Sequence, residues 1–170
     1  MKSKKNIVLI GMMGSGKSSI GKILSKKLNI SFIDIDRKIE EVESLSISDI
    51  FKKNGENYFR KIEEKISLKY LKSENNVISL GGGGFINSQI RKFCKKTCLS
   101  FWLNWKNETI IKRIYKSKKR PMVTNLTKDK INNLIKERSK IYELSNYKIN
   151  CDKLDKVQII NMILDIYENK

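Results

Sequence analysis

A glycine-rich segment near the N-terminus has the residue types needed to hold phosphate groups. The apolar run 7–10 leads into Gly11-Met12-Met13-Gly14-Ser15-Gly16-Lys17-Ser18, which has the form G-x-x-x-x-G-K-S. Between a strand and a helix, this pattern is typical of the phosphate-binding loop, or P-loop. Its glycines allow close approach of the backbone to a polyphosphate, and its amide N–H groups face the phosphates. The alternative, a glycine-rich turn that binds nothing, agrees poorly with the complete spacing.

The side chains at the end of the motif predict a nucleotide bound together with Mg²⁺. Lys17 can reach the β- and γ-phosphate oxygens, and the Ser18 hydroxyl can ligate the metal. Asp34 and Asp36 follow the next apolar segment. One of these carboxylates can lie near the metal, and the other can take the proton of an acceptor hydroxyl. The alternative for the pair is the N-cap of a helix that starts near Arg37, and Asp36 could cap and still bind substrate.

Two further segments carry groups that suit a small anionic substrate. Arg60 is followed on a predicted helix by Glu63 and Glu64. This spacing fits an exposed ion pair of little energetic value, and it fits equally an arginine that Glu63 holds and aims at a substrate carboxylate. The run Gly81–Gly84 follows a buried strand and presents bare backbone N–H groups to a ligand. Its alternative is a tight turn.

Three later arginines lie around a polar segment. Residues 116–121 hold the only proline and predict a mobile loop or lid between helices. Arg113 and Arg120 flank this lid, and Arg120 could swing over the transferring phosphoryl group and neutralise developing charge. Arg138 lies on the next helix, where an ordinary surface position is the alternative. Only six of the 36 basic residues are arginines, which suggests that arginine is kept where a planar fork is needed.

Strand-like and helix-like segments alternate along the chain, which predicts an α/β fold. The expected strands cover 6–10, 31–34, 77–80, 98–103 and 147–150. The expected helices cover 18–28, 37–43, 48–71, 87–94, 107–115, 128–144 and 155–167. In the last helix, one apolar face is expected to hold Val157, Ile160, Ile163 and Ile166.

Five short parallel strands with helices on both faces fit the 170 residues as one three-layer domain. In such a sheet, ligands bind at the carboxyl ends of the strands. The P-loop, the two aspartates and the glycine run all follow predicted strands, so we expect them to meet at one edge of the sheet.

The net charge of +18 invites a nucleic-acid partner, but the composition favours a solvated lysine surface. Lys, Ile and Asn fill 72 of the 170 positions, which indicates compositional bias. The lysines are scattered and are not interleaved with aromatic residues, so no specific nucleic-acid partner is expected.

The absence of a recognisable targeting signal and the pattern of cysteines both favour a cytoplasmic protein. No apolar run is long enough to span a membrane, and the short run 7–10 ends in the P-loop, which excludes a signal peptide. Cys94, Cys98 and Cys151 match neither a zinc site nor a redox pair, and the chain has no histidine. Reduced, buried thiols are therefore expected.

Taken together, these residues closely resemble the shikimate kinase family. The matching segments are G-M-M-G-S-G-K-S-S at 11–19, D-I-D at 34–36, G-E-N-Y-F-R-K-I-E at 55–63, G-G-G at 81–83, R-P at 120–121 and E-R-x-x-x-Y at 137–142. They occur in the family's order and spacing over residues 6–150. The resemblance implies a P-loop kinase fold with a lid, and transfer of the ATP γ-phosphoryl group to the 3-hydroxyl of shikimate, towards chorismate and the aromatic amino acids.

The resemblance also implies a role for each matching residue. ATP would be bound by Gly14, Ser15, Gly16, Lys17, Ser18, Ser19, Arg113 and Arg120. Arg113 would stack on adenine, and Arg120 would be the lid arginine on the phosphates. Ser18 and Asp34 would organise Mg²⁺. Shikimate would be bound by Asp36, Arg60, Gly82 and Arg138, with the two arginines on its carboxylate and the Gly82 backbone on its ring. The catalytic residues would be Lys17, Asp36 and Arg120.

Within the single domain 1–170, the substrate-binding helical segment is expected at 36–63 and the lid at 115–126. A monomer is expected. The sequence departs from the family pattern in Gly84, which extends the glycine run, in the lysine-rich lid, and in a C-terminal adenine-contacting segment that cannot be aligned.

Two alternatives belong to other functional classes. The first is another small-molecule kinase on the same fold, such as a gluconate or nucleoside-monophosphate kinase. Paired arginines and D-x-D favour a carboxylated polyol over a nucleotide. The second is a P-loop protein without catalysis, or a basic nucleic-acid-binding protein. It would lack the acceptor acid or the lid arginine, and both are present.

Overall fold

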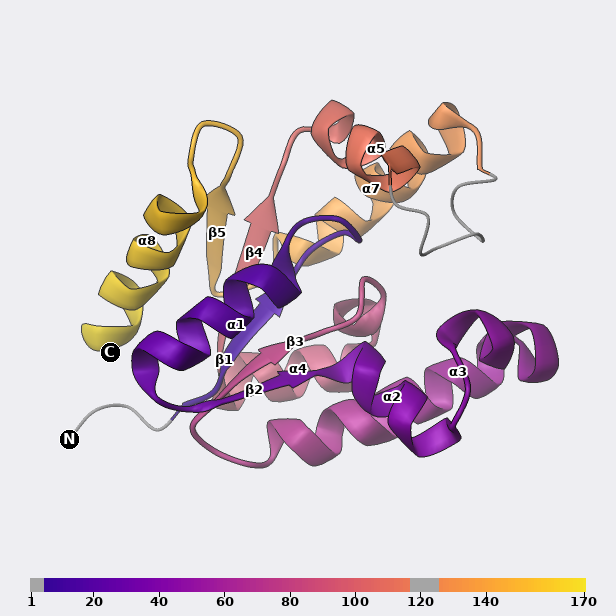
Figure 1. Ribbon diagram of the computed structural model, residues 1–170, viewed down its shortest axis with the longest axis horizontal. Helices are drawn as coiled ribbons and strands as arrows, with labels where there is room; N and C mark the ends of the chain where they lie inside the picture. Colours follow the sequence, from indigo (N-terminus) through magenta and orange to yellow (C-terminus); the bar gives the residue numbers. More distant parts are fainter. Residues whose placement is uncertain (1–4, 117–125) are drawn as a thin grey trace.

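A five-stranded parallel sheet forms the centre of the chain (Figure 1). The computed structural model describes residues 5–116 and 126–170. The strand order is β2-β3-β1-β4-β5, with β1 in the middle. The strands are β1 (Ile7–Ile10), β2 (Ser31–Asp34), β3 (Asn76–Ser79), β4 (Leu99–Asn104) and β5 (Tyr147–Asn150). The predicted parallel α/β sheet is therefore confirmed.

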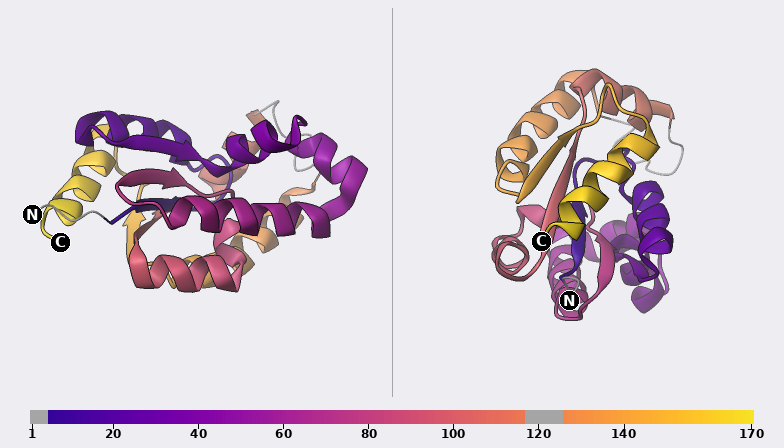
Figure 2. Two further views of the ribbon diagram at one scale, coloured as in Figure 1. Left: turned by 90° about the horizontal axis from the view of Figure 1, so that it is seen from below. Right: turned by 90° about the vertical axis from the view of Figure 1, so that its left-hand side faces the viewer.

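Helices cover both faces of this sheet, so that the domain has three layers (Figure 2). Helices α1 and α8 lie on one face, and α3, α4 and α7 lie on the other. The helices are α1 (Lys17–Leu28), α2 (Ile35–Glu43), α3 (Ile47–Leu71), α4 (Ser88–Thr97), α5 (Asn107–Lys116), α7 (Lys128–Tyr142) and α8 (Lys156–Glu168), with a short 3-10 helix η1 (Gly84–Ile86) before α4.

The central strand shows how the sequence builds two cores. Side chains alternate between the faces of a strand, and all four residues of β1 are buried. Ile7 and Leu9 pack in the cluster that contains Leu24 of α1. Val8 and Ile10 pack in the other cluster, with residues of α3, α4 and α7. The apolar run 7–10 is therefore a fully buried strand, which fixes the position of the P-loop that follows it.

Most predicted elements are confirmed, with ends that differ by a few residues. The sequence reasoning missed η1, and its apolar face for the last helix is partly wrong. Val157 is 59% exposed, whereas Ile159 and Tyr167 are buried with Ile160 and Ile163. Residues spaced by three drift around a helix because one turn holds about 3.6 residues. Val157 therefore projects away from the face that α8 packs against the sheet.

The two functional segments expected within the domain are described to different extents. The segment 36–63 consists of α2 and the first part of α3, and α3 bends at Gly55, where φ is 80° and ψ is 172°. Most of the expected lid lies outside the described residues, and so does Arg120. The lid therefore stays a prediction.

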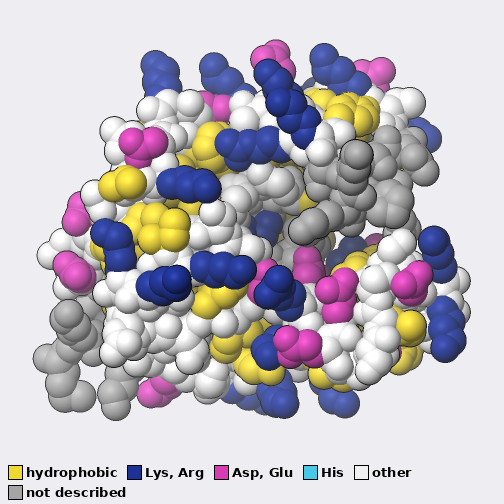
Figure 3. Space-filling model, in the orientation of Figure 1, with side chains coloured by type: hydrophobic (Ala, Val, Ile, Leu, Met, Phe, Trp, Pro, Cys, Tyr) yellow, Lys and Arg dark blue, Asp and Glu magenta, His cyan; other side chains and the backbone are white. Residues whose placement is uncertain are grey.

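The surface and the cysteines agree with the composition. Lys and Arg side chains are spread over the face shown in Figure 3 and form no single block. Cys94, Cys98 and Cys151 are free and buried, as predicted. Among the helices of the described ranges, none has the length and apolarity to cross a membrane.

Gly55→Ala tests the bend in α3. A Cβ at this position would meet no heavy atom within 4 Å, so its cost comes from the backbone conformation alone. We expect the free energy of unfolding to fall by about 1–3 kcal/mol, measured by urea denaturation. Lys53→Ala, at an exposed position of the same helix, is the matched control. Equal stability of the two variants would show that alanine adopts the backbone conformation of Gly55 without strain.

Candidate active site

The P-loop connects β1 to α1 and leaves the first turn of that helix without a side-chain cap. Gly16, the N-cap residue, adopts a left-handed conformation with φ 91°, which favours glycine. The Ser15 amide donates to the Met12 carbonyl at 3.1 Å and closes the loop. Amide groups at a helix N-terminus that lack a side-chain cap are suited to binding an anion. This geometry agrees with the predicted phosphate site.

The ammonium group of Lys17 lies inside the loop. Its Nζ donates to the carbonyl oxygens of Gly11 at 2.8 Å and Met12 at 2.9 Å, and the residue is 8% exposed. Burial of this charge is tolerated because two backbone carbonyls accept from it. The loop therefore holds a positive charge beside the uncapped amides of α1.

Ser18 and Asp34 form the pair predicted to organise Mg²⁺. The Ser18 Oγ donates to the Asp34 Oδ2 at 2.5 Å. No cluster of three or more His, Cys, Asp or Glu occurs within residues 5–116 and 126–170. However, Mg²⁺ commonly takes one or two carboxylates together with substrate phosphates. One hydroxyl and one carboxylate next to a P-loop fit this ligand set.

Asp34, and not Asp36, caps α2. The Arg37 amide donates to the Asp34 side chain at 3.5 Å, and α2 begins at Ile35, two residues before the predicted start. Since β2 ends at Asp34 and α2 begins at Ile35, the two carboxylates belong to different elements. Asp36 takes its position from the first turn of α2.

The carboxylates of Asp36 and Glu63 meet at Gly81. A Cβ on Gly81 would lie 2.5 Å from the Asp36 Oδ1 and 2.8 Å from the Glu63 Oε1. These two acids come from α2 and α3, and the glycine follows β3. The expected convergence at the carboxyl ends of β2 and β3 is thus present.

The ion pair between Arg60 and Glu63 is partly buried. The Arg60 Nη1 lies 2.6 Å from the Glu63 Oε2, and the Glu63 side chain is 2% exposed. Glu56 adds a second carboxylate at 3.1 Å from the Arg60 Nη2. The burial of Glu63 favours the interpretation of an arginine held in position by its neighbour.

Burial raises the pKa of the Glu63 carboxyl above its ordinary value. The Arg60 guanidinium opposes this shift, while the nearby charge of Asp36 adds to it. The site therefore contains an acid whose ionised form depends on Arg60.

The glycine run forms a turn, and its backbone also lies close to the Arg60 guanidinium. The Gly84 amide donates to the Gly81 carbonyl at 3.0 Å, and the chain enters η1. None of Gly81–Gly84 has a positive φ. A Cβ on Gly83 would overlap the Arg60 guanidinium, whereas one on Gly84 would have its nearest neighbour at 3.5 Å. A Cβ would therefore crowd the neighbouring charged side chains at Gly81 and Gly83, whereas at Gly82 and Gly84 its nearest neighbours would lie at ordinary contact distances of 3.4 Å and 3.5 Å.

Helix α7 brings Arg138 and Tyr142 to the same turn. The Arg138 Nη1 is buried without a hydrogen-bond partner among the described residues, and it lies 3.4 Å from the position of a Gly82 Cβ. The Tyr142 hydroxyl donates to the Gly82 carbonyl and lies 3.8 Å from the Met12 Sδ. Burial raises the pKa of Tyr142 to about 12, so the hydroxyl remains a donor at neutral pH.

Sequence reasoning gave Tyr142 no role beyond its place in a motif. The available signal was its spacing of four residues from Arg138, which places both on one helix face. The structure shows that Tyr142 connects the glycine turn to the P-loop.

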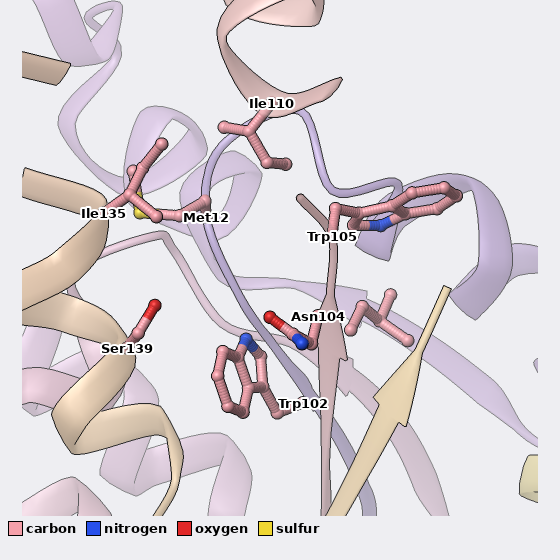
Figure 4. Close-up of a pocket in the computed structure, with 8 residues that line it drawn as sticks. Met12, Trp102, Asn104, Trp105, Ile110, Ile135 and Ser139 are labelled. Carbon is pink, nitrogen blue, oxygen red and sulfur yellow. The ribbon is translucent and has the colours of Figure 1, made fainter. Parts of the chain in front are cut away.

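Arg113 lies beside the P-loop, as its predicted contact with ATP requires. Its Nη1 donates to the Gly14 carbonyl at 3.2 Å, and its guanidinium lies 3.8 Å from the ring centre of Trp105. Sequence reasoning did not single out Trp105. A separate small pocket between β4, the P-loop and α7 contains none of the predicted site residues (Figure 4).

Comparison with known proteins agrees with this geometry. The profile of the shikimate kinase family matches residues 13–168. The chain belongs to this family. It is therefore an enzyme that phosphorylates shikimate with ATP, in the pathway to the aromatic amino acids, as the resemblance implied.

Individual shikimate kinases match over almost the whole chain. The enzyme of Sulfurihydrogenibium sp. is 42% identical over 160 residues, covering 94% of this chain and 96% of its own. The enzyme of Bacillus subtilis is 38% identical, covering 95% and 88%. A solved structure of the Acinetobacter baumannii shikimate kinase in complex with shikimate has a TM-score of 0.91 at 30% identity, covering 99% of this chain and 96% of that one.

A gluconokinase from Sinorhizobium meliloti shares the fold alone. Its structure covers 99% of this chain and 94% of its own, with 15% identity and a TM-score of 0.59. The chain therefore shares only its fold with this other small-molecule kinase, whereas it shares its family with the shikimate kinases.

Glu63→Gln tests the electrostatics of this site. Because the folded protein raises the Glu63 pKa, the folded state keeps a proton that the unfolded chain releases at lower pH. We compare the free energy of unfolding of the wild type with that of the variant at each pH. This difference should fall as the pH rises from 4.5, the ordinary pKa of a glutamate, through the raised pKa of Glu63 in the folded protein. Above the raised pKa it should stay constant.

Urea unfolding from about pH 4 to about pH 8 measures this difference. Glu41→Gln, at a 60% exposed carboxylate on α2, is the control for loss of one negative charge. Parallel pH curves for the wild type and Glu63→Gln would contradict the raised pKa.

Proposed function

We propose that phosphoryl transfer goes to the 3-hydroxyl of shikimate, and that the residues around the glycine turn bind this substrate. One observation carries the proposal: an acid from α2, an arginine pair from α3 and α7, and the glycine turn all lie beside one P-loop. This arrangement offers cationic forks for a carboxylate and an acid for a hydroxyl.

Arg60 and Arg138 bind the carboxylate of shikimate. The buried Arg138 Nη1 lacks a hydrogen-bond partner in the part of the chain described, so a carboxylate oxygen would satisfy it. Glu63 fixes the Arg60 guanidinium from the opposite side. The Gly82 backbone, held by Tyr142, lies against the ring of the substrate.

Asp36 accepts the proton of the attacking hydroxyl. The hydroxyl oxygen then forms a bond to the γ-phosphorus, the bond from phosphorus to the β–γ bridging oxygen breaks, and ADP leaves. Lys17 and the loop amides offset the negative charge of the phosphates. Arg120, which lies outside the described residues, is proposed as the lid arginine on these phosphates.

Ser18 and Asp34 are the proposed protein ligands of Mg²⁺. The hydrogen bond between them at 2.5 Å places both oxygens together at the P-loop. When bound with ATP, the metal ion would neutralise negative charge on the phosphates during transfer.

The enzyme is proposed to act as a monomer in the cytoplasm. All residues given a role lie on one chain, so a second copy is not needed to complete the site. The free, buried thiols agree with a reducing compartment.

Release of ADP from Mg-ATP, with and without shikimate, tests the proposed acceptor. Strong stimulation by shikimate and little by quinate is expected. Stimulation by both acids would contradict the proposed selectivity. Detection of the phosphate on another hydroxyl by NMR would contradict the assignment of the 3-hydroxyl.

Asp36→Asn tests the proton acceptor. A neutral amide cannot take the proton, so we expect kcat to fall by about 10²–10⁴-fold, while ATP binding measured by calorimetry is retained. Near-normal turnover would exclude Asp36 from this role.

Gly83→Ala and Gly84→Ala form a matched pair that tests the placement of Arg60. Both add one Cβ to the same turn, but only the Cβ on Gly83 would overlap the guanidinium. Displacement of a charge-assisted pair should raise the KM for shikimate about tenfold or more in Gly83→Ala and little in Gly84→Ala. Equal KM values in steady-state assays would show that the position of Arg60 does not control substrate binding.

A further inference from the structure

We propose that Trp105 is a positioning residue for the nucleotide base, and that it acts by holding the Arg113 guanidinium flat for stacking. This inference rests on the contact of Arg113 with adenine that the family resemblance predicts, and extends it to a residue with no assigned role. The part of the nucleotide that Arg113 would contact is its planar purine base.

The position of Trp105 is restrained by its own indole and by the residues that follow it. Its Nε1 donates to the Ser15 carbonyl of the P-loop at 3.0 Å. The next residue, Lys106, has its amide bonded to Asp152 at 2.8 Å, and the same carboxylate accepts from Thr109 at 3.0 Å. The turn between β4 and α5 is thereby tied to the loop after β5, which restrains the indole plane.

The guanidinium of Arg113 packs on this plane. Its central carbon lies 3.8 Å from the indole ring centre, which is close for a cation–π contact. The Arg113 Nη1 also donates to the Gly14 carbonyl. Trp105 and Arg113 therefore bind neighbouring carbonyls of the P-loop, and each restrains the other.

A guanidinium held flat by one aromatic ring is prepared to stack on a second one. Arginine stacks on aromatic faces because its charge is delocalised over a plane. Both side chains are partly exposed, and they lie next to the loop that binds phosphates. A base attached to those phosphates can therefore reach the guanidinium without disturbing the indole beneath it.

The second tryptophan of the chain provides a control. Trp102 is 4% exposed and packs near Tyr142, with ring centres 5.8 Å apart. Figure 4 shows the two indoles of β4 and its following turn pointing in different directions, with Trp102 towards α7. Only Trp105 contacts Arg113 and the P-loop in this way.

The chain has two tryptophans, so each single substitution leaves one fluorescent reporter. In Trp102→Phe, the fluorescence of Trp105 should change when Mg-ADP is added without shikimate. In Trp105→Phe, the fluorescence of Trp102 should stay constant. The absence of a response from Trp105, with ADP binding confirmed by calorimetry, would overturn the proposal.

A double-mutant cycle tests whether Trp105 acts through Arg113. We expect Trp105→Ala and Arg113→Ala each to raise the Kd for Mg-ADP about five- to tenfold, and the double variant to lose no more than the larger single effect. Multiplication of the two single effects, or an unchanged Kd in Trp105→Ala, would contradict the proposed positioning role.

Two measurements separate this role from a general loss of structure. The KM for shikimate should stay unchanged in Trp105→Ala, and an equal rise in both KM values would overturn the proposal. Trp105→Phe keeps an aromatic ring under Arg113 and should raise the Kd for Mg-ADP by about two- to threefold. This variant replaces Trp105→Ala in the test if the alanine variant fails to fold. Because Mg-ADP binding requires no acceptor, these results are readable even if shikimate stimulation fails.

Discussion

The ion pair between Arg60 and the buried Glu63 carboxylate is the interaction on which the acceptor half of the proposed site depends. A carboxylate that is 2% exposed requires a charged partner, and Arg60 provides one at 2.6 Å. Once the pair is fixed, the neighbouring chain must come close without side chains. This explains why glycine stands at Gly81 and Gly83 although neither has a positive φ. The glycine turn is thus shaped by the electrostatics of α3.

The two arginines of the proposed carboxylate site differ in what they contribute. Glu63 neutralises much of the charge of Arg60, so Arg60 contributes mainly geometry. Arg138 approaches from α7, and its buried Nη1 has no acceptor within the described residues. A buried donor without a partner carries a desolvation cost that a substrate carboxylate removes. In the proposed site, selectivity for a carboxylated acceptor would therefore follow from one arginine that is paired and one whose Nη1 has no acceptor among the described residues.

The sequence predicted the elements whose signals are local. The P-loop, the order of strands and helices, and the meeting of Asp36 with the glycine run followed from spacing and from the rule for parallel sheets. The burial of Glu63 could not be predicted, because the same spacing fits an exposed ion pair. The sequence left open which aspartate of the pair caps α2, because either can accept from an amide of the first turn, and in the structure Asp34 accepts from the Arg37 amide. Tyr142 and Trp105 act through contacts distant in sequence.

Two contacts distant in sequence join the halves of the site. Tyr142 donates to the Gly82 carbonyl of the acceptor side and touches Met12 of the P-loop. Trp105 and Arg113 donate to the carbonyls of Ser15 and Gly14, in the middle of that loop. The P-loop is thereby held at two places by side chains that are distant in sequence. Since a shift of about 1 Å can strongly reduce the rate of a transfer reaction, contacts that fix the P-loop relative to the glycine turn bear directly on the proposed transfer. The fold is shared with a gluconokinase at 15% identity, whereas these contacts come from this chain's own side chains.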